Sequence, residues 1–418
     1  MRLTIGAPAF DVLDRRLARD AKTPIGVAVS GGGDSLMALR LLSAWASRCG
    51  RRVIAFSVDH AIQPQSAAWL AFVGAAAERL GCGFAPLTWE GEKPATGLAA
   101  AARMARHRLI AEAARAAGVQ VIVFGHTADD RIEADFMRAA GHRMGELREW
   151  SPSPAWPEGR GLFVLRPLLG VRRAAIREAL AAEGETWIDD PLNQDLRSPR
   201  ARARLQAARV DGPLDREDDG DLARLAAQAS VGVGGDISID RQALRLAPRA
   251  AAQRLVGAAA TCAGGRSSAP RGERLEVLTD RILGAAPFAG VLSGARVLAS
   301  EDVRFVRDAG EAARGGLQPL ELGPGETGVW DGRFNLTAGA EPTTIVRLAG
   351  HAGALDRAQR DRLKALPASV RPGLPVRVRP DGAPVCPILA EDASVEVRLL
   401  VAERFFAACG VISKEPAT

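Results

Sequence analysis

The chain has 418 residues, of which 47% are hydrophobic and 25% charged, enough core material for two or three domains. Its net charge of +6 suits a polyanionic partner, although ordinary enzymes can be equally rich in arginine. The five cysteines form no Cys-x-x-Cys pair and the five histidines show no ligand spacing, so we expect no zinc or iron–sulfur site. The sequence contains neither an apolar run of membrane length nor a signal-peptide pattern, so we expect no membrane contact and a cytoplasmic location.

The first half of the chain alternates apolar runs with alanine-rich helical stretches. Strands are predicted at 25–29, 53–58, 82–89 and 119–124, and helices at 35–48, 66–80 and 98–117. This alternation predicts an α/β fold with a doubly wound parallel sheet, in which ligands bind at the carboxyl ends of the strands.

A glycine-rich segment, Ser30-Gly31-Gly32-Gly33-Asp34-Ser35, joins the first predicted strand to the first helix. Glycines let backbone N–H groups converge on phosphate oxygens, and the helix N-terminus adds partial positive charge. Ser30 and Ser35 can donate hydroxyl hydrogen bonds, and Asp34 can hold a Mg²⁺ that bridges phosphates. The segment is neither a Walker A loop nor a dinucleotide fingerprint, and its alternative explanation is a turn that binds nothing.

Two further segments suit a nucleotide. Asp59 and His60 end the second strand, where short polar groups commonly hold adenine and ribose, although an Asp that starts a loop explains the pair equally well. Arg103 and Arg106 share one face of a predicted helix and suit a triphosphate or an RNA backbone. A solvated helix face is an equally good explanation of these arginines.

An acidic segment follows the fourth predicted strand. It contains His126 and then Asp129, Asp130 and Glu133, which crowd the first turns of the next helix. Acidic residues favour helix N-termini in general, but three carboxylates over a nucleotide site point to binding of an ammonium group, Mg²⁺ or both. Close carboxylates also raise one another's pKa, which is one way to tune a general base.

The remaining signals mark later segments and boundaries. Arg166 ends a strand-like run, and a turn with Asp190 and Asn193 leads into an arginine group better explained by RNA contacts. Asp331-Gly332 predicts a hairpin turn. A polar acidic stretch near residue 215 divides the chain, so we predict a catalytic domain over 1–212, a mainly helical domain over 217–315 and a small mixed, strand-rich domain over 316–418.

In this order, the segments resemble the tRNA(Ile)-lysidine synthetases, a family of PP-loop ATP pyrophosphatases. The resemblance covers about residues 24 to 205 and extends through the glycine loop, V-D-H, A-R-x-x-R, H-x-x-D-D-x-x-E, R-P-L and D-x-x-N followed by arginines. The chain departs from the family pattern at three positions. His107 replaces a tyrosine, Ala99 a Gln or Glu, and Ala201 an Asn.

The resemblance implies a carbon–nitrogen ligase that uses ATP and Mg²⁺. Its substrates would be L-lysine and tRNA(Ile) with a CAU anticodon, whose wobble cytidine is adenylated with release of pyrophosphate and then takes lysine at C2 with release of AMP. The product would decode AUA instead of AUG. The two later domains would bind tRNA, with Arg266 and Arg271 as candidate contacts, and a homodimer is left open. One alternative is another PP-loop tRNA-modifying enzyme, such as a cytidine 2-thiolase, although the absence of paired cysteines disfavours it. The other alternative is a decayed, non-catalytic RNA-binding protein.

The resemblance also implies roles for individual residues. The expected catalytic residues are Asp34, Asp129, Asp130, Glu133 and Arg103. ATP binding is expected from Ser30, Gly31, Gly32, Gly33, Asp34, Ser35, Asp59, His60 and His126, with Asp34 also holding the metal. Binding of lysine or tRNA is expected from Asp129, Asp130, Glu133, Asn193, Arg106, Arg200 and Arg204.

Overall fold

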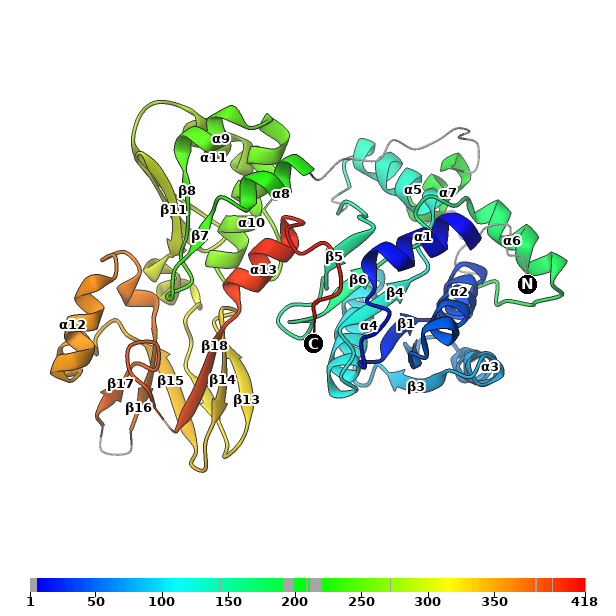
Figure 1. Cartoon of the computed structure of the whole chain (residues 1–418), viewed down its shortest axis with the longest axis horizontal. Helices are drawn as coiled ribbons and strands as arrows, with labels where there is room; N and C mark the ends of the chain where they lie inside the picture. Colours follow the sequence, from blue (N-terminus) through cyan, green and yellow to red (C-terminus); the bar gives the residue numbers. More distant parts are fainter. Residues whose placement is uncertain are drawn as a thin grey trace. The chain divides into compact units, whose positions relative to one another are not determined.

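The structure is a computed structural model. It describes residues 6–142, 145–190, 199–207, 210, 220–270, 272–379, 382–392 and 394–417. The chain divides into two compact units, Met1–Glu217 with Ile412–Thr418, and Asp218–Val411 (Figure 1). Among the described helices, none combines the length and apolar character needed to span a membrane.

The first unit is built on a six-stranded sheet in the order β3-β2-β1-β4-β6-β5, in which only the edge strand β5 is antiparallel to its neighbour. The strands are β1 (Ile25–Ala28), β2 (Val53–Asp59), β3 (Gly83–Thr88), β4 (Val121–Phe124), β5 (Trp150–Pro152) and β6 (Phe163–Leu165). The helices are α1 (Gly6–Arg16), α2 (Gly33–Cys49), α3 (Ser66–Arg79), α4 (Leu98–Ala116), α5 (Ala128–Ala139), α6 (Arg173–Ala182) and α7 (Pro199–Ala207). The doubly wound α/β prediction is confirmed.

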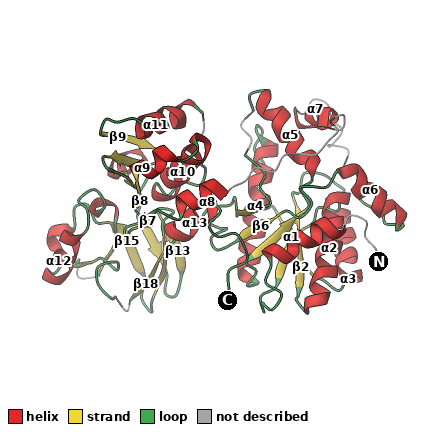
Figure 2. Cartoon of the chain, turned by 45° about the horizontal axis from the view of Figure 1, so that its top comes forward, coloured by secondary structure: helices red, strands yellow, loops and turns green. Residues whose placement is uncertain are grey.

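Helices flank this sheet (Figure 2). Every residue of β4 is buried, as a central strand covered on both faces requires. Helix α4 packs on the sheet through Ile110, Ala111 and Ala114. The chain order of the strands reverses between β1 and β4, and the crevice at the carboxyl ends of these two strands is the position where such folds bind ligands.

The second unit contains three antiparallel sheets. The first has the order β7-β8-β11-β10-β9 and the strands β7 (Ser230–Val231), β8 (Ile237–Asp240), β9 (Phe288–Leu292), β10 (Ala295–Ala299) and β11 (Asp302–Arg307). The second contains β12 (Leu320–Leu322), β15 (Thr343–Arg347), β16 (Pro375–Val378) and β17 (Pro384–Val385). The third contains β13 (Thr327–Trp330), β14 (Phe334–Ala338) and β18 (Val395–Leu399). The helices are α8 (Gly220–Ala226), α9 (Arg241–Leu246), α10 (Arg249–Ala263), α11 (Glu273–Leu283), α12 (Arg357–Ala365) and α13 (Val401–Ala408).

The predicted Asp331-Gly332 hairpin turn joins β13 to β14, and both residues adopt positive φ (51° and 67°). Helices α8 to α11 lie within 217–315, which the sequence predicted to be mainly helical, but the five-stranded sheet in the same range was not anticipated. Its β9–β10 hairpin turns through Ser293-Gly294, also at positive φ, and lacks the Asn-Gly or Asp-Gly pair that signals such a turn. The division into two units does not separate 217–315 from 316–418, so that boundary stays a prediction.

The C-terminal segment packs against the first unit. Glu415 forms an ion pair with Arg51 at 2.7 Å, and both side chains are only 1% exposed. The Trp150 indole donates a hydrogen bond to the carbonyl of Ile412 at 2.8 Å. The chain therefore returns to the first unit after completing the second.

Candidate active site

The glycine-rich segment forms a turn between β1 and α2. Gly31 adopts φ +83°, and a Cβ placed there would lie 2.4 Å from Ile188, which explains the need for glycine. Gly32 is the N-cap of α2 and has no side chain to cap it. The Ser35 hydroxyl donates to the carbonyl of Gly32 and lies 3.3 Å from the Ser30 hydroxyl. An uncapped helix N-terminus beside two hydroxyls is a suitable place for an anion.

The turn after β4 approaches this loop closely. A Cβ on Gly125 would lie 2.5 Å from the backbone oxygen of Asp34 and 2.9 Å from the Cα of Ser35. Only a glycine permits this backbone contact. It places Asp34 beside the helix α5 that begins three residues later.

The three acidic residues in the first turns of α5, Asp129, Asp130 and Glu133, are all buried. Asp130 completes a capping box, because its carboxylate accepts hydrogen bonds from the backbone N–H (2.8 Å) and hydroxyl (3.0 Å) of Thr127. Glu133 is only 3% exposed. The structure therefore brings together Asp34, Asp129, Asp130 and Glu133, as the sequence predicted.

These carboxylates are paired with arginines from α7 and from the N-terminal end of α6. Arg173 contacts Asp34 (2.8 Å), Glu133 (2.9 Å) and Asp130 (3.4 Å). The other pairs are Arg172–Asp129 (3.1 Å), Arg200–Asp130 (3.1 Å), Arg200–Glu133 (3.4 Å) and Arg204–Glu133 (3.4 Å). Arg200 and Arg204 were predicted to bind substrate, and in the structure they contact Asp130 and Glu133 of α5.

The pKa shifts follow from burial and this pairing. Burial raises the pKa of Asp34, with Arg173 opposing the shift and Asp130 adding to it. Burial also acts to raise the pKa of Asp130, but the pKa is lowered, because Arg173, the backbone N–H of Thr127 and Arg200 favour the charged carboxylate. Burial disfavours the charge on Arg173, yet Asp130, Asp34 and Glu133 raise its pKa. The neighbouring carboxylates therefore do not raise the pKa of Asp130 above its usual value, as crowding alone would.

A second group of arginines lies beside the acidic residues without acidic partners of its own. Among the described residues, Arg103 and Arg106 of α4 have no ion-pair partner. Burial, together with repulsion from Arg103 and Arg200, lowers the pKa of Arg106 to about 10, so it stays charged at neutral pH. Guanidiniums that repel one another without a neutralising carboxylate are suited to binding a phosphate.

His126 lies between these groups. Its Nδ1 accepts a hydrogen bond from Nε of Arg166 at 3.1 Å, and its ring stacks on Phe124. Burial and then Arg166 hold the pKa of His126 well below its usual value, so the ring is neutral. Because Arg166 cannot accept a proton, the hydrogen must reside on Nε2, which makes that atom a donor.

Asp59 and His60 lie at the end of β2. The Asp59 carboxylate accepts a hydrogen bond from the backbone N–H of Ala61 at 2.6 Å, as expected of an Asp that starts a loop. The His60 ring packs edge-on against Trp89, and burial lowers its pKa. Their nucleotide contact stays a prediction.

Sequence reasoning missed Arg172 and Arg173. A signal for them existed, because two cations at the start of a helix oppose its dipole and need another purpose. Asn193 and Arg271 lie outside the described residues. Arg266 forms an ion pair with Glu311.

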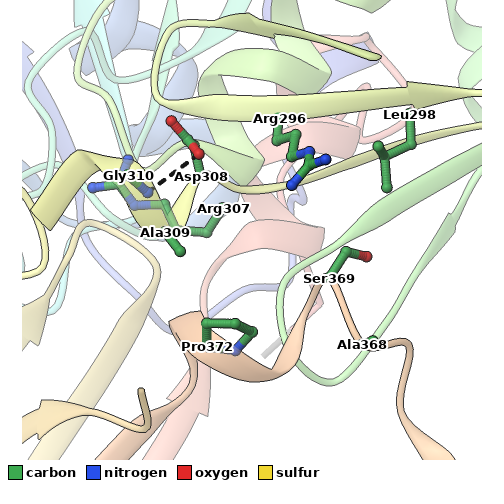
Figure 3. Close-up of a pocket in the computed structure, with 9 residues that line it drawn as sticks. All are labelled: Arg296, Leu298, Arg307, Asp308, Ala309, Gly310, Ala368, Ser369 and Pro372. Carbon is green, nitrogen blue, oxygen red and sulfur yellow. Dashed lines mark hydrogen bonds between the residues drawn. The ribbon is translucent and has the colours of Figure 1, made fainter. Parts of the chain in front are cut away.

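The described part of the second unit holds a cavity of about 420 Å³ between β10 and the segment around Pro372 (Figure 3). Arg307 is buried at its edge and is neutralised by both carboxylate oxygens of Asp331. Arg296 is exposed, extends from β10 toward the cavity, and has no ion-pair partner among the described residues. The cavity therefore presents one unneutralised positive charge.

A parallel sheet with an uncapped glycine loop after β1 and acidic residues after β4 defines an α/β nucleotide-binding domain, and the PP-loop domain family matches residues 11–210. A tRNA(Ile)-lysidine synthase from Caulobacter vibrioides is 46% identical, with 97% of this chain and 98% of that protein covered. Enzymes of the same name from Rhizobium meliloti (34%; 91% and 86% covered) and Hyphomonas neptunium (36%; 66% and 79% covered) are also similar. The chain belongs to the tRNA(Ile)-lysidine synthase family, whose members are ligase-type enzymes that use ATP.

Proposed function

We propose that this enzyme joins L-lysine to C2 of the wobble cytidine of a tRNA(Ile) with a CAU anticodon and thereby converts AUG decoding to AUA decoding. The observation that carries the proposal is the buried acidic group Asp129, Asp130 and Glu133 beside the glycine-rich loop from Ser30 to Ser35, which we call the phosphate-type loop. A single crevice thus offers an anion site and a cation site, as a reaction between ATP and an amino group requires. Cytoplasm is the proposed location.

In the first step, the cytosine O2 attacks the α-phosphorus of ATP and pyrophosphate leaves. The turn from Ser30 to Ser35 would hold the β- and γ-phosphates through backbone N–H groups and the two hydroxyls. His126 would donate a hydrogen bond from Nε2 to the nucleotide. Arg103 would neutralise charge that develops at the α-phosphate.

The residues also fit a magnesium ion. Oδ1 of Asp34 has no hydrogen-bond partner among the described residues, and protein-bound Mg²⁺ is commonly held through one or two carboxylates plus phosphates. No described group of three acidic, histidine or cysteine side chains is arranged as a complete metal cage. Asp34 would hold the ion, which would neutralise phosphate charge when bound.

In the second step, the lysine Nε attacks C2 and AMP leaves with the former cytosine oxygen. At neutral pH only about one lysine amine in two thousand is uncharged, so the ammonium must be bound and then deprotonated. Asp129, Asp130 and Glu133 would recognise the ammonium, and one of them would accept its proton.

Contacts with tRNA would come from both units. Arg106 and Arg200 in the first unit, and Arg296 beside the cavity of the second, are suited to backbone phosphates. Asn193 is a further candidate from the sequence. The target cytidine must leave the anticodon stack to reach the crevice.

The test is incorporation of labelled L-lysine into tRNA(Ile) with ATP and Mg²⁺, by the wild type and by Asp34→Ala. Label that depends on ATP and is lost in the variant would support the proposal. No label, with ATP still cleaved to AMP when tRNA is present, would retain the ATP chemistry and discard lysine. A cytidine 2-thiolase would then be considered, although the five cysteines are dispersed single thiols, three of them buried.

A further inference from the structure

The active-site carboxylates are paired with guanidiniums of the same chain. Four carboxylates (Asp34, Asp129, Asp130 and Glu133) face four guanidiniums (Arg172, Arg173, Arg200 and Arg204), and each carboxylate has at least one ion pair within 3.4 Å. A cation that enters must separate one of these pairs. An arginine that is separated needs another anion, because an unpaired buried charge is costly.

Arg173 is the one of these four arginines that reaches both parts of the crevice. Its Nε donates to Asp34, which lies in the phosphate-type loop, while Nη1 donates to Glu133 on α5. Its Nη2 lies 3.4 Å from Asp130. The side chain is only 11% exposed, whereas Arg200 is 49% exposed. Arg173 therefore links the anion site to the cation site.

We infer that Arg173 occupies the position that the lysine ammonium takes and moves to the phosphates when the nucleotide binds. The inference rests on the proposed function. A triphosphate at the loop brings several negative charges next to Asp34 and offers the guanidinium a stronger, forked partner. Asp130 and Glu133 then lose one cation, and the ammonium of lysine can replace it.

The backbone of Arg173 is anchored, so that only the side chain has to move. Its N–H donates to Oδ2 of Asp129 at 2.7 Å at the first residue of α6. The guanidinium already contacts Asp34, and its displacement is therefore a short rotation toward the loop. The consequence is positive coupling between nucleotide and lysine, which linkage makes equal in both directions.

The experiment measures equilibrium binding of labelled L-lysine to the full chain by dialysis, without tRNA. It is done with and without α,β-methylene-ATP, which cannot be cleaved between its α- and β-phosphates, at constant Mg²⁺. In the wild type the analogue should tighten lysine binding by about tenfold. In Arg173→Gln, lysine should bind more tightly than in the wild type without the analogue, and the effect of the analogue should fall to less than about twofold.

Two further variants keep the result interpretable. Arg173→Lys retains the charge but cannot reach three carboxylates at once, so it should show an intermediate effect of the analogue. Arg177→Gln is the matched control, because Arg177 lies one turn further along α6 and pairs with Asp189 in an exposed contact. It should keep the wild-type coupling. A merely structural role of Arg173 predicts weaker lysine binding in Arg173→Gln, the opposite of our expectation.

Three outcomes would overturn the inference. They are equal lysine affinity with and without the analogue in the wild type, unchanged coupling in Arg173→Gln, and no lysine binding in either condition by an enzyme that still attaches lysine to tRNA. If the enzyme neither binds lysine nor attaches it to tRNA, the proposed function fails together with the inference.

Discussion

Substitution of Gly125 by alanine tests whether the approach of β4 to the phosphate-type loop positions the chemistry. The new Cβ would lie 2.5 Å from the backbone oxygen and 2.7 Å from the backbone carbon of Asp34, whereas an ordinary contact is at least 3.4 Å. The new Cβ clashes with backbone atoms, so no side-chain rotation relieves the clash. The loop must therefore move by about 0.9 Å, the difference between these distances.

A displacement near 1 Å in a site that orients reacting groups costs about 100-fold in rate. We therefore expect Gly125→Ala to lower kcat/KM for lysine incorporation by about 10- to 100-fold. The overpacking should lower the free energy of unfolding by about 1–3 kcal/mol. Steady-state incorporation of labelled lysine into tRNA, together with a thermal unfolding curve, measures both effects.

Gly170→Ala is the matched control. Gly170 lies in the same unit, adopts no positive φ, and a Cβ there would meet nothing within 4 Å. It should leave both kcat/KM and Tm unchanged. A Gly125→Ala enzyme with wild-type kcat/KM would refute the argument that this contact positions the loop.

Three further substitutions test other parts of the molecule. Glu415→Gln should destabilise the first unit by about 3 kcal/mol, because it leaves the buried Arg51 without its carboxylate, and urea unfolding measures the loss. Arg296→Glu should weaken tRNA binding several-fold and reduce its salt slope by about 1 in filter binding, with lysine binding unchanged. Burial, then Arg103 and Arg106, lowers the pKa of His107 to about 3, so the unfolded chain binds the proton better. The contribution of neutral His107 to the free energy of unfolding is complete above pH 6.5 and falls as the pH drops toward 3. The wild type should therefore lose about 2 kcal/mol of this free energy between pH 7.5 and 5 that His107→Phe does not lose, and thermal scans at the two pH values measure the difference.

The strands β1 to β4 and the helices α2 to α4 were predictable because their signals are local, whereas α1, β5, α6 and α7 were not predicted. The predicted strand 25–29 and helix 35–48 correspond to β1 (Ile25–Ala28) and α2 (Gly33–Cys49), since an apolar run, a glycine turn and a helical pattern are adjacent in the chain. The gathering of Asp34 with the acidic residues of α5 followed from the rule that ligands bind at strand carboxyl ends.

The partners of those acidic residues were not predictable in the same way. Arg173 is 139 residues from Asp34 and 40 from Glu133 in sequence, and no periodic pattern relates them. Composition indicated many arginines but not which carboxylates they neutralise. The return of Glu415 to Arg51 across 364 residues was likewise invisible, because a single buried ion pair leaves no repeating signal.

The ion pairs between the arginines and the carboxylates of α5 bear on whether Asp130 binds the lysine ammonium or accepts its proton. Crowded carboxylates alone would raise one another's pKa and favour a proton acceptor. At Asp130, however, the pKa is lowered despite burial, because Arg173, the backbone N–H of Thr127 and Arg200 favour the charged form, so this carboxylate stays ionised. An ionised, buried carboxylate is suited to holding an ammonium rather than to taking its proton before the attack. A proton must still leave the ammonium before its nitrogen has a lone pair to attack C2, and Asp129 or Glu133 would accept it. The acidity of the nitrogen then rises steeply as the bond to C2 forms, so an ordinary carboxylate suffices to accept the second proton. Recognition of the ammonium is therefore the primary role that we propose for Asp130.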